Sequence, residues 1–249
     1  MRGRPRDDYV ISTKVGREGE REFDYGATGV AHSIRRSCAR LGVARLDVVY
    51  VHDVDPDMHG DSFERRYADA IEGAYPTLRA LRDEGVVAAI GAGLKDWNVA
   101  LRLVQAAQLD CVMLAGGYTL LQHGALDALL PWCEAHGVGI VLAAPFNSGI
   151  LARGAVEGAR YYYEPAPPEI MQRTRDIEAV CARHGVPLAA AALQFPLHHP
   201  AIASVVVGHE RAVEVERNLS LMRHPIPGAF WQALKQRGLL REDAPTPKE

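Results

Sequence analysis

The chain has 249 residues, of which 48% are hydrophobic, so it is long enough to bury the core of one large domain. Its 28 basic and 31 acidic residues give a net charge of -3 without any block of like charge, which excludes a basic arm for nucleic acid. No segment approaches the roughly 18 apolar residues of a membrane helix, and no apolar stretch of signal-peptide length follows the first residues. We therefore expect a cytoplasmic protein that binds a small, weakly charged molecule and neither nucleic acid nor membrane.

Short apolar runs alternate with helical patterns along the whole chain, which is typical of repeated βα units around a parallel sheet. We expect strands at Tyr9–Thr13, Leu46–Val51, Val87–Gly91, Cys111–Leu114, Gly139–Ala143 and Ile202–Val207. Apolar residues at helical spacing predict helices over residues 30–41, 71–81, 97–107, 125–136, 169–184, 188–198 and 212–222. Glycines at the helix ends predict left-handed C-caps at Gly42, Gly85, Gly137 and Gly185.

The nearly continuous apolarity of these strands indicates that both of their faces are covered, as in a (β/α)-barrel. The sequence therefore predicts one TIM-type barrel domain over residues 1–249. A closed barrel has eight strands, so the six expected strands indicate that the first two βα units are missing. Residues 240–249 are expected to form a loose tail.

Two long connections, 52–70 and 145–168, follow predicted strands. Loops of such length in a compact domain are usually functional or mobile. Both lie after strand C-termini, which is the face where barrel enzymes place their sites. We therefore expect the site among these two loops and the neighbouring strand ends.

The four cysteines lie far apart, and none belongs to a CxxC pair. This spacing favours buried thiols in a reducing compartment over a zinc or redox motif. They are Cys38, Cys111, Cys133 and Cys181.

Residues 8–17, DYVISTKVGR, and residues 46–53, LDVVYVHD, resemble the third-strand and fourth-strand motifs of the aldo-keto reductases. Residues 117–121, 145–152 and 191–197 resemble the subfamily that contains L-fucose, D-threo-aldose and pyridoxal dehydrogenases. The resemblance implies an oxidoreductase that transfers a hydride between a nicotinamide and an aldose or a related aldehyde or alcohol.

The catalytic set of that family contains a tyrosine, a lysine that lowers its pKa, an orienting histidine and an aspartate that pairs with the lysine. By this resemblance Lys14 matches the lysine and His52 the histidine. An ammonium beside a phenol stabilises the phenolate, which is why acid–base catalysis uses the pair. The tyrosine and aspartate belong to a segment that the family pattern places upstream of Arg4, so we expect little turnover from this chain. Tyr25 and Tyr118 are the candidates to replace the tyrosine, with packing as their default role.

The resemblance also implies a cofactor site, for NAD or NADP. The loop Pro145–Leu151 is expected to present backbone amides and polar side chains to a pyrophosphate. A carboxylate at Glu214 would repel a 2′-phosphate, which favours NAD. The expected cofactor-binding residues are Tyr118, Pro145, Asn147, Ser148, Gly149, Leu151, Gly208, Glu214 and Asn218. Asp53 and Trp97 are expected on the substrate side.

Two segments depart from the family pattern. Ala92–Lys95 occupies the place where many members carry a serine and an asparagine that hold the carboxamide, and Gly117 stands where close relatives have arginine. These differences predict an altered nicotinamide pocket.

No metal site is expected. Asp53, Asp55, Asp57 and Glu64 fit four positions of a calcium loop, but Met58 stands where the turn needs glycine. Gly91-Ala92-Gly93 lacks the third glycine of a dinucleotide fingerprint. The pair His198-His199 has no further ligand at metal spacing, and Tyr161–Tyr163 is read as lid or packing residues.

A competing hypothesis comes from another class of protein. A non-catalytic barrel remnant would bind a small ligand or a protein partner instead of turning over a substrate. An open barrel exposes strand edges and apolar surface, which promotes association between chains.

Overall fold

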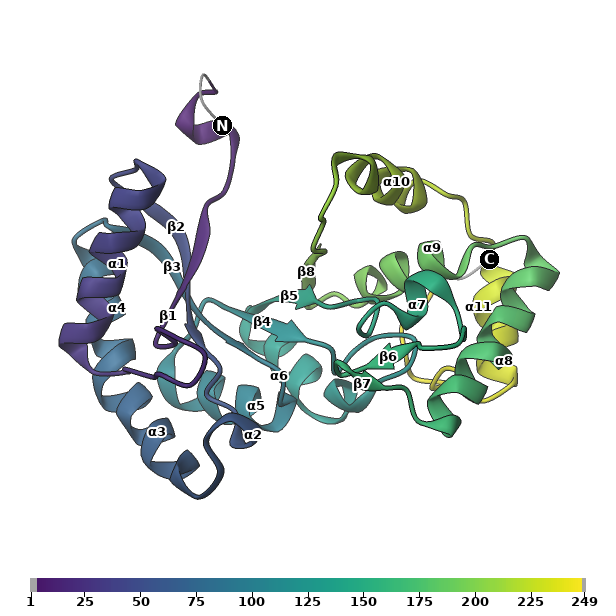
Figure 1. The fold of residues 1–249 in the computed structure, drawn as a ribbon, viewed down its shortest axis with the longest axis horizontal. Coiled ribbons are helices and arrows are strands. Elements are labelled where there is room, and N and C mark those ends of the chain that lie inside the picture. Colours follow the sequence, from purple (N-terminus) through teal and green to yellow (C-terminus); the bar gives the residue numbers. More distant parts are fainter. Residues whose placement is uncertain (1–3, 248–249) are drawn as a thin grey trace. The chain divides into compact units, whose positions relative to one another are not determined.

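The computed structural model describes residues 4–247 and is shown in Figure 1. The chain falls into two compact units. The first contains the residues up to Leu114 together with His136–Gly139, and the second contains Ala115–Ala135 and the residues from Ile140 onward. Strands and helices alternate throughout, as the sequence predicted for an α/β fold.

The first unit is built on strands that pair in parallel and in chain order. They are β1 (Ser12–Val15), β2 (Leu46–His52), β3 (Val87–Leu94) and β4 (Cys111–Ala115). The register places Lys14 opposite Tyr50 and His52 opposite Gly93. This register brings the C-terminal ends of the strands, where the polar residues stand, to one edge of the sheet.

Helices of the first unit bury apolar side chains against these strands. They are α1 (Ala27–Leu41), α4 (Tyr75–Asp83) and α5 (Trp97–Ala107), and α1 and α4 lie side by side in Figure 1. Val49 and Ile90 of the strands are buried together with Leu78 of α4 and Leu103 of α5. Most of the hydrophobic positions that predicted the helices therefore lie in the core, whereas Leu41 at the end of α1 is 49% exposed.

The first strand begins three residues later than the sequence predicted. Apolar alternation predicted Tyr9–Thr13, whereas ladder pairing starts at Ser12, opposite Val48. The side chain of Asp47 accepts the backbone amide of Ile11 at 2.7 Å, so a carboxylate occupies a position that a strand partner would otherwise take.

The connection predicted as a long loop at 52–70 is largely helical. It contains α2 (Pro56–His59) and α3 (Phe63–Asp69), and a π-helical turn at Ala70–Ala74 joins α3 to α4. Asp55 has extended backbone angles at the N-cap, and proline is well suited to the first helical position because its φ is fixed there. The loop prediction was wrong because these helices are short and polar, so they lack an apolar stripe from which a helix could be predicted.

The second unit contains the parallel pair β5 (Gly139–Ala143) and β8 (Ile202–Val206). Its helices are α6 (Leu129–His136), α7 (Ile150–Arg153), α8 (Pro168–His184), α9 (Leu188–Gln194), α10 (Ala212–Met222) and α11 (Gly228–Gln236). The predicted helices at 125–136 and 188–198 each include a 3-10 turn, at Gly124–Asp127 and Phe195–His198. The sequence did not predict α11.

The second predicted loop, 145–168, also contains regular structure. Besides α7 it forms a small antiparallel hairpin of β6 (Arg160–Tyr161) and β7 (Glu164–Pro165). Tyr162 and Tyr163 form the tip, both with positive φ, which is the backbone conformation that tight hairpin turns require.

The glycine C-caps are confirmed. Positive φ values of 68°, 77°, 69° and 64° occur at Gly42, Gly85, Gly137 and Gly185. The tail differs from its prediction over residues 240–247, because Leu240 and Ala244 are buried and Arg241 forms ion pairs with Asp127 and Asp243. Residues 248–249 of that predicted tail lie outside the described part of the chain.

Candidate active site

Lys14 and His52, the two predicted catalytic residues, lie at the ends of adjacent parallel strands. Lys14 stands in β1 and is exposed, whereas His52 is the last residue of β2 and is half-buried. Burial lowers the pKa of His52, and the positive charges of Lys14 and Arg17 lower it further, whereas Asp53 opposes them. The Lys14 ammonium forms no hydrogen bond or ion pair with any residue in the described range 4–247.

Asp53 follows His52 and is buried between the Arg17 guanidinium and the His52 imidazole. Its Oδ2 atom lies 2.5 Å from an Arg17 guanidinium nitrogen, and its Oδ1 atom lies 3.3 Å from Nε2 of His52. Its backbone has a φ of 56°, in the left-handed region that a non-glycine residue seldom adopts. The amide of Asp53 donates to the carbonyl of Gly93 at 2.8 Å, which fixes this residue to β3.

Tyr25 is buried beneath this strand end and its hydroxyl points at backbone. The hydroxyl lies 2.9 Å from the carbonyl oxygen of His52 and 3.1 Å from that of Asp53. Nε2 of His59 lies 2.9 Å from the same Asp53 carbonyl and 3.1 Å from the Tyr25 hydroxyl. Burial raises the pKa of Tyr25 well above its ordinary value, and the neighbouring carboxylates of Asp53 and Asp55 raise it further. The phenol is therefore a protonated donor that holds the backbone, which fits the packing role better than that of a catalytic acid.

Asp55, which the sequence singled out only as part of a rejected calcium loop, is fully buried. Its carboxylate accepts the backbone amides of Lys95 and Asp96 at 2.9–3.2 Å. Burial raises its pKa to about 6 despite these two hydrogen bonds. Asp55 thus joins the end of β2 to the start of α5, where the half-buried Trp97 is the first residue.

The neighbouring Asp57 pairs with the Lys95 ammonium at 2.5 Å instead of facing a metal. Within residues 4–247 no group of three or more metal-ligating side chains is gathered at one place. An aspartate directly before a proline at a strand end was the sequence signal that could have identified Asp55 as a structural cap.

In the second unit, the predicted pyrophosphate loop has an unusual backbone. Ala144, Asn147 and Ser148 all have positive φ, and Gly149 has a φ of 95°. The amides of Asn147, Gly149 and Leu151 donate to carbonyls inside the loop itself. Among the described residues, the backbone amides of Phe146 and Ser148 have no such partner.

Gln122, which the sequence did not indicate, organises the side chains of this loop. Its Oε1 accepts the Asn147 side-chain amide at 2.9 Å and the backbone amide of Gly117 at 3.2 Å. Its Nε2 donates to the Tyr162 hydroxyl at 2.6 Å, while Ser148 Oγ accepts the amide of Tyr163 at 3.0 Å. The tip of the β6–β7 hairpin is thereby attached to the predicted cofactor loop.

Tyr118 was predicted to line the nicotinamide pocket. Its ring is fully buried, with centroids 4.9 Å from Phe195 and 5.7 Å from His199. The role of Tyr118 toward a nicotinamide stays a prediction, since the structure places its ring within an aromatic cluster.

A cavity of about 450 Å³, which we call the arginine cavity, brings several predicted cofactor residues together. It is lined by Phe146, Ala152, Arg153, Ala189, Gly208, Glu210, Arg211, Glu214, Arg217, Asn218 and Leu221. Gly208, Glu214 and Asn218 were predicted, whereas the three arginines were not. Glu214 pairs with Arg211 at 3.2 Å, and hydrogen bonds from the Glu210 amide and from Arg211 lower the pKa of the Glu214 carboxyl.

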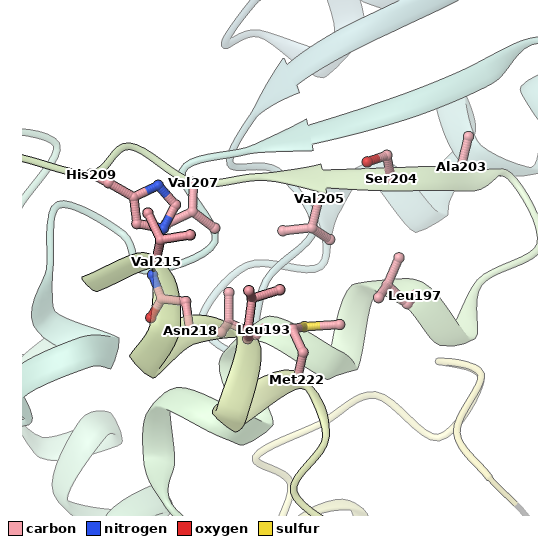
Figure 2. A pocket seen from close by; sticks show the side chains of 11 residues that line it. Leu193, Leu197, Ala203, Ser204, Val205, Val207, His209, Val215, Asn218 and Met222 are labelled. Carbon is pink, nitrogen blue, oxygen red and sulfur yellow. Dashed lines mark hydrogen bonds between the residues drawn. The ribbon is translucent and has the colours of Figure 1, made fainter. Parts of the chain in front are cut away.

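A second, apolar cleft of about 330 Å³ lies between β8, α9 and α10. Figure 2 shows Val205, Val207 and Met222 among its lining side chains, with Asn218 and His209 at one end. Asn218 Nδ2 lies 3.0 Å from Nε2 of His209. Asn218 therefore lines both hollows, and it ties α10 to the segment that follows β8.

Helices long and apolar enough to cross a membrane do not occur in residues 4–247. All four cysteines are present as free thiols, with Cys133 and Cys181 buried. Burial raises the pKa of the Cys133 thiol to about 12, so this side chain is an apolar packing group.

Comparison with known proteins gives the family of this parallel α/β fold. Residues 2–237 match the Aldo/keto reductase family, so the chain belongs to that family. It is 37% identical to a D-threo-aldose 1-dehydrogenase from Pseudomonas sp over 271 aligned residues, covering 99% of this chain and 79% of that protein.

Two further comparisons agree. A pyridoxal 4-dehydrogenase from Microbacterium luteolum is 36% identical, with 88% of this chain and 64% of that protein covered. This chain therefore spans just under two thirds of the pyridoxal enzyme. Among solved structures, the holo form of an aldo-keto reductase from Bacillus halodurans superposes with a TM-score of 0.74 at 20% identity, covering 93% of this chain and 73% of that one. At this identity the likeness shows the fold alone.

Proposed function

We propose that this chain is an NAD(P)-dependent oxidoreductase that transfers a hydride between a nicotinamide and an aldose or a related aldehyde or alcohol. The observation that carries the proposal is the placement of Lys14 and His52 at adjacent strand ends, where the charge of Lys14 acts on the imidazole. The similarity to enzymes described as acting on D-threo-aldoses and pyridoxal supports this substrate class. We also infer that β1 and β2 are the third and fourth strands of the family's eight-stranded barrel.

The arginine cavity fits a dinucleotide. Its lining carries three positive charges and two negative charges, and this excess of positive charge suits anionic phosphates. The positive charges belong to Arg153, Arg211 and Arg217, and the negative charges to Glu210 and Glu214. The unpaired amides of Phe146 and Ser148 are further donors in the adjoining loop. When bound, the cofactor would supply the acceptor or donor of the hydride.

The cofactor preference that we propose is NAD. Glu214 lines the arginine cavity, and its lowered pKa keeps it ionised at neutral pH. An ionised carboxylate opposes a 2′-phosphate, although its pairing with Arg211 weakens the repulsion. We expect Glu214→Gln to increase the affinity for NADPH relative to NADH, while Glu216→Gln on the same helix leaves the ratio unchanged.

In the chemical step, the residues of this chain act on the substrate's oxygen. His52 would hydrogen-bond that oxygen and orient the reacting carbon, and the Lys14 ammonium would stabilise negative charge that develops beside it. Trp97, at the start of α5, would contribute an apolar wall for the sugar.

The direct test measures NAD-dependent oxidation of a panel of aldoses and pyridoxal by the full chain and by Lys14→Met. The sequence predicted little turnover, but the similarity to two dehydrogenases over most of this chain supports an active enzyme, so we expect turnover by the wild type. For the variant we expect a loss of at least about 100-fold in kcat. Lys235→Met, on an exposed part of α11, is the matched control and should keep wild-type turnover. Nucleotide binding without turnover by the wild type would contradict the enzymatic proposal and favour the non-catalytic alternative.

The compartment and the oligomeric state stay as predicted from the sequence, which is a cytoplasmic protein that can associate through open strand edges. Cell fractionation tests the compartment, and light scattering of the purified chain tests the oligomeric state.

A further inference from the structure

We propose that Asp53 is a positioning residue for His52, held in place by Arg17, and that its carboxylate keeps the proton of the neutral imidazole on Nε2, which leaves Nδ1 to accept a hydrogen bond from a substrate hydroxyl. The inference rests on the proposed function, since it gives Asp53 a role in the reaction only if His52 meets the substrate. It changes the sequence-based expectation that Asp53 itself contacts the substrate.

Each carboxylate oxygen of Asp53 has a side-chain nitrogen beside it. Oδ2 lies 2.5 Å from Arg17 and Oδ1 lies 3.3 Å from Nε2 of His52. The side chain is 10% exposed, so little of it is open to a substrate hydroxyl. Because a neutral imidazole carries one N–H, a carboxylate at this distance favours the tautomer with the proton on Nε2.

Arg17 is itself immobilised, so Asp53 is aimed by a fixed group. Its Nε donates to the carbonyl of Gly19 at 3.2 Å, and its NH2 group donates to that of Glu20 at 3.0 Å. Its guanidinium also lies 5.9 Å from the centroid of the Phe23 ring. With these contacts the guanidinium has one orientation, which sets the position of the carboxylate.

The backbone of Asp53 is held from the opposite side. Its φ of 56° is costly for a residue other than glycine and persists only where the surroundings enforce it. Here the Tyr25 hydroxyl and Nε2 of His59 both reach the Asp53 carbonyl, at 3.1 and 2.9 Å. Strained backbone at a strand end is a common feature of sites that need one fixed geometry.

The charges that act on His52 support the same role. Asp53 is the one that stabilises its protonated form, while Lys14 and Arg17 both oppose protonation. Burial of the ring opposes protonation as well. Removing the Asp53 charge therefore leaves His52 facing two cations with no counter-charge, and the ring is free to turn.

The experiment follows the ring nitrogens of His52 by NMR in the full chain labelled with ¹⁵N-histidine. We compare the wild type with Asp53→Asn and with Arg17→Met, and we use Asp57→Asn as the matched control because that carboxylate pairs with Lys95. In the wild type we expect Nε2 protonated. In Asp53→Asn we expect a mixture of tautomers and a lower pKa of His52, whereas Arg17→Met should raise that pKa and Asp57→Asn should change neither. A thermal melt of each variant shows that it is folded, and Arg17→Met tests the same arrangement if Asp53→Asn does not fold.

An unchanged tautomer and an unchanged pKa of His52 in folded Asp53→Asn would overturn the proposal. So would an unchanged pKa in Arg17→Met. In the kinetic assay, loss of ring orientation should lower kcat about 10- to 100-fold with the KM for the sugar nearly constant. If the wild type shows no turnover, the proposed function fails, while the NMR comparison still decides whether Asp53 positions His52.

Discussion

The ends of β1 and β2 and the helix α10 hold their side chains in opposite ways. At the strand ends Asp53 and Asp55 are buried, and each has defined partners in hydrogen bonds or ion pairs. In α10 no residue is buried, and Leu219 is 52% exposed although it lines the apolar cleft. The surroundings of His52 thus form a rigid environment, whereas the proposed cofactor residues of α10 belong to an adaptable one.

This difference follows from what each region must do. A proton or hydride transfer depends on the position of the reacting groups within about 0.5 Å, so the surroundings of His52 need to be fixed. Binding of phosphates depends on long, flexible arginine side chains such as Arg211, which is 74% exposed. Such groups become ordered when the ligand arrives, at a cost in affinity.

The largest expected contrast comes from truncating one leucine in each kind of environment. Leu103→Ala in α5 removes a fully buried side chain and should lower the free energy of unfolding by about 3–5 kcal/mol. Leu219→Ala in α10 should change it by less than about 0.5 kcal/mol, because the side chain is largely in water already. Urea unfolding of both variants measures the contrast, and equal losses would show that α10 is packed as firmly as α5.

The next largest effect concerns Gly16, which lies against the buried ring of Tyr25. A Cβ atom there would come within 2.4 Å of the ring, and the glycine has a φ of 96°. We expect Gly16→Ala to destabilise the chain by about 2–4 kcal/mol through the clash and the positive φ together.

Gly85→Ala is the matched control for that variant. Gly85 has a φ of 77° with no atom within 4 Å of the added Cβ, so its substitution carries the backbone cost alone, roughly 1 kcal/mol. The two melting temperatures separate the clash from the backbone cost. Equal melting temperatures for Gly16→Ala and Gly85→Ala would mean that the Tyr25 ring is free to move. The Tyr25 hydroxyl would then not hold the carbonyl of Asp53 in place.

The smallest effect is a pH dependence that belongs to Asp55. Burial raises its pKa in the folded chain to about 6, above the ordinary value of 3.8, so folding favours its protonated form. The stabilisation is therefore fully present below about pH 4 and is lost as the pH rises through 6. Its size is about 2–3 kcal/mol. Asp47, whose pKa is lowered, contributes in the opposite sense as the pH falls, so the comparison must be made against a variant.

Asp55→Asn is that variant, because it cannot titrate. The difference in unfolding free energy between the wild type and Asp55→Asn should change between pH 4 and pH 7, with the wild type relatively weaker at pH 7. A constant difference across this range would mean that Asp55 ionises as in water and that the junction between β2 and α5 is open to solvent.

The same contrast explains how far the sequence could lead. Local apolar periodicity predicted Gly139–Ala143, 97–107 and 212–222 at their observed bounds. The short helices α2 and α3 after β2 were not predicted, because they are polar and are stabilised by their surroundings. Propensity gave no signal strong enough to find them.

The site divides along the same line. Lys14 and His52 were identified because residues 8–17 and 46–53 resemble strand motifs of the family. Gln122 could not be identified, because its role arises from the meeting of three distant segments, at Gly117, Asn147 and Tyr162. The arginines of the arginine cavity could not be predicted either, because arginine is common along the whole sequence.

The proposed function requires that this member of the aldo/keto reductase family binds a nicotinamide dinucleotide, and a binding measurement on the full chain is its first test. NADH fluorescence is followed during titration with the protein, with NADPH measured in parallel. We expect saturable binding of NADH and of NADPH, with NADH bound more tightly. A sample that unfolds in one sharp transition yet gives no saturable change with either nucleotide would contradict it.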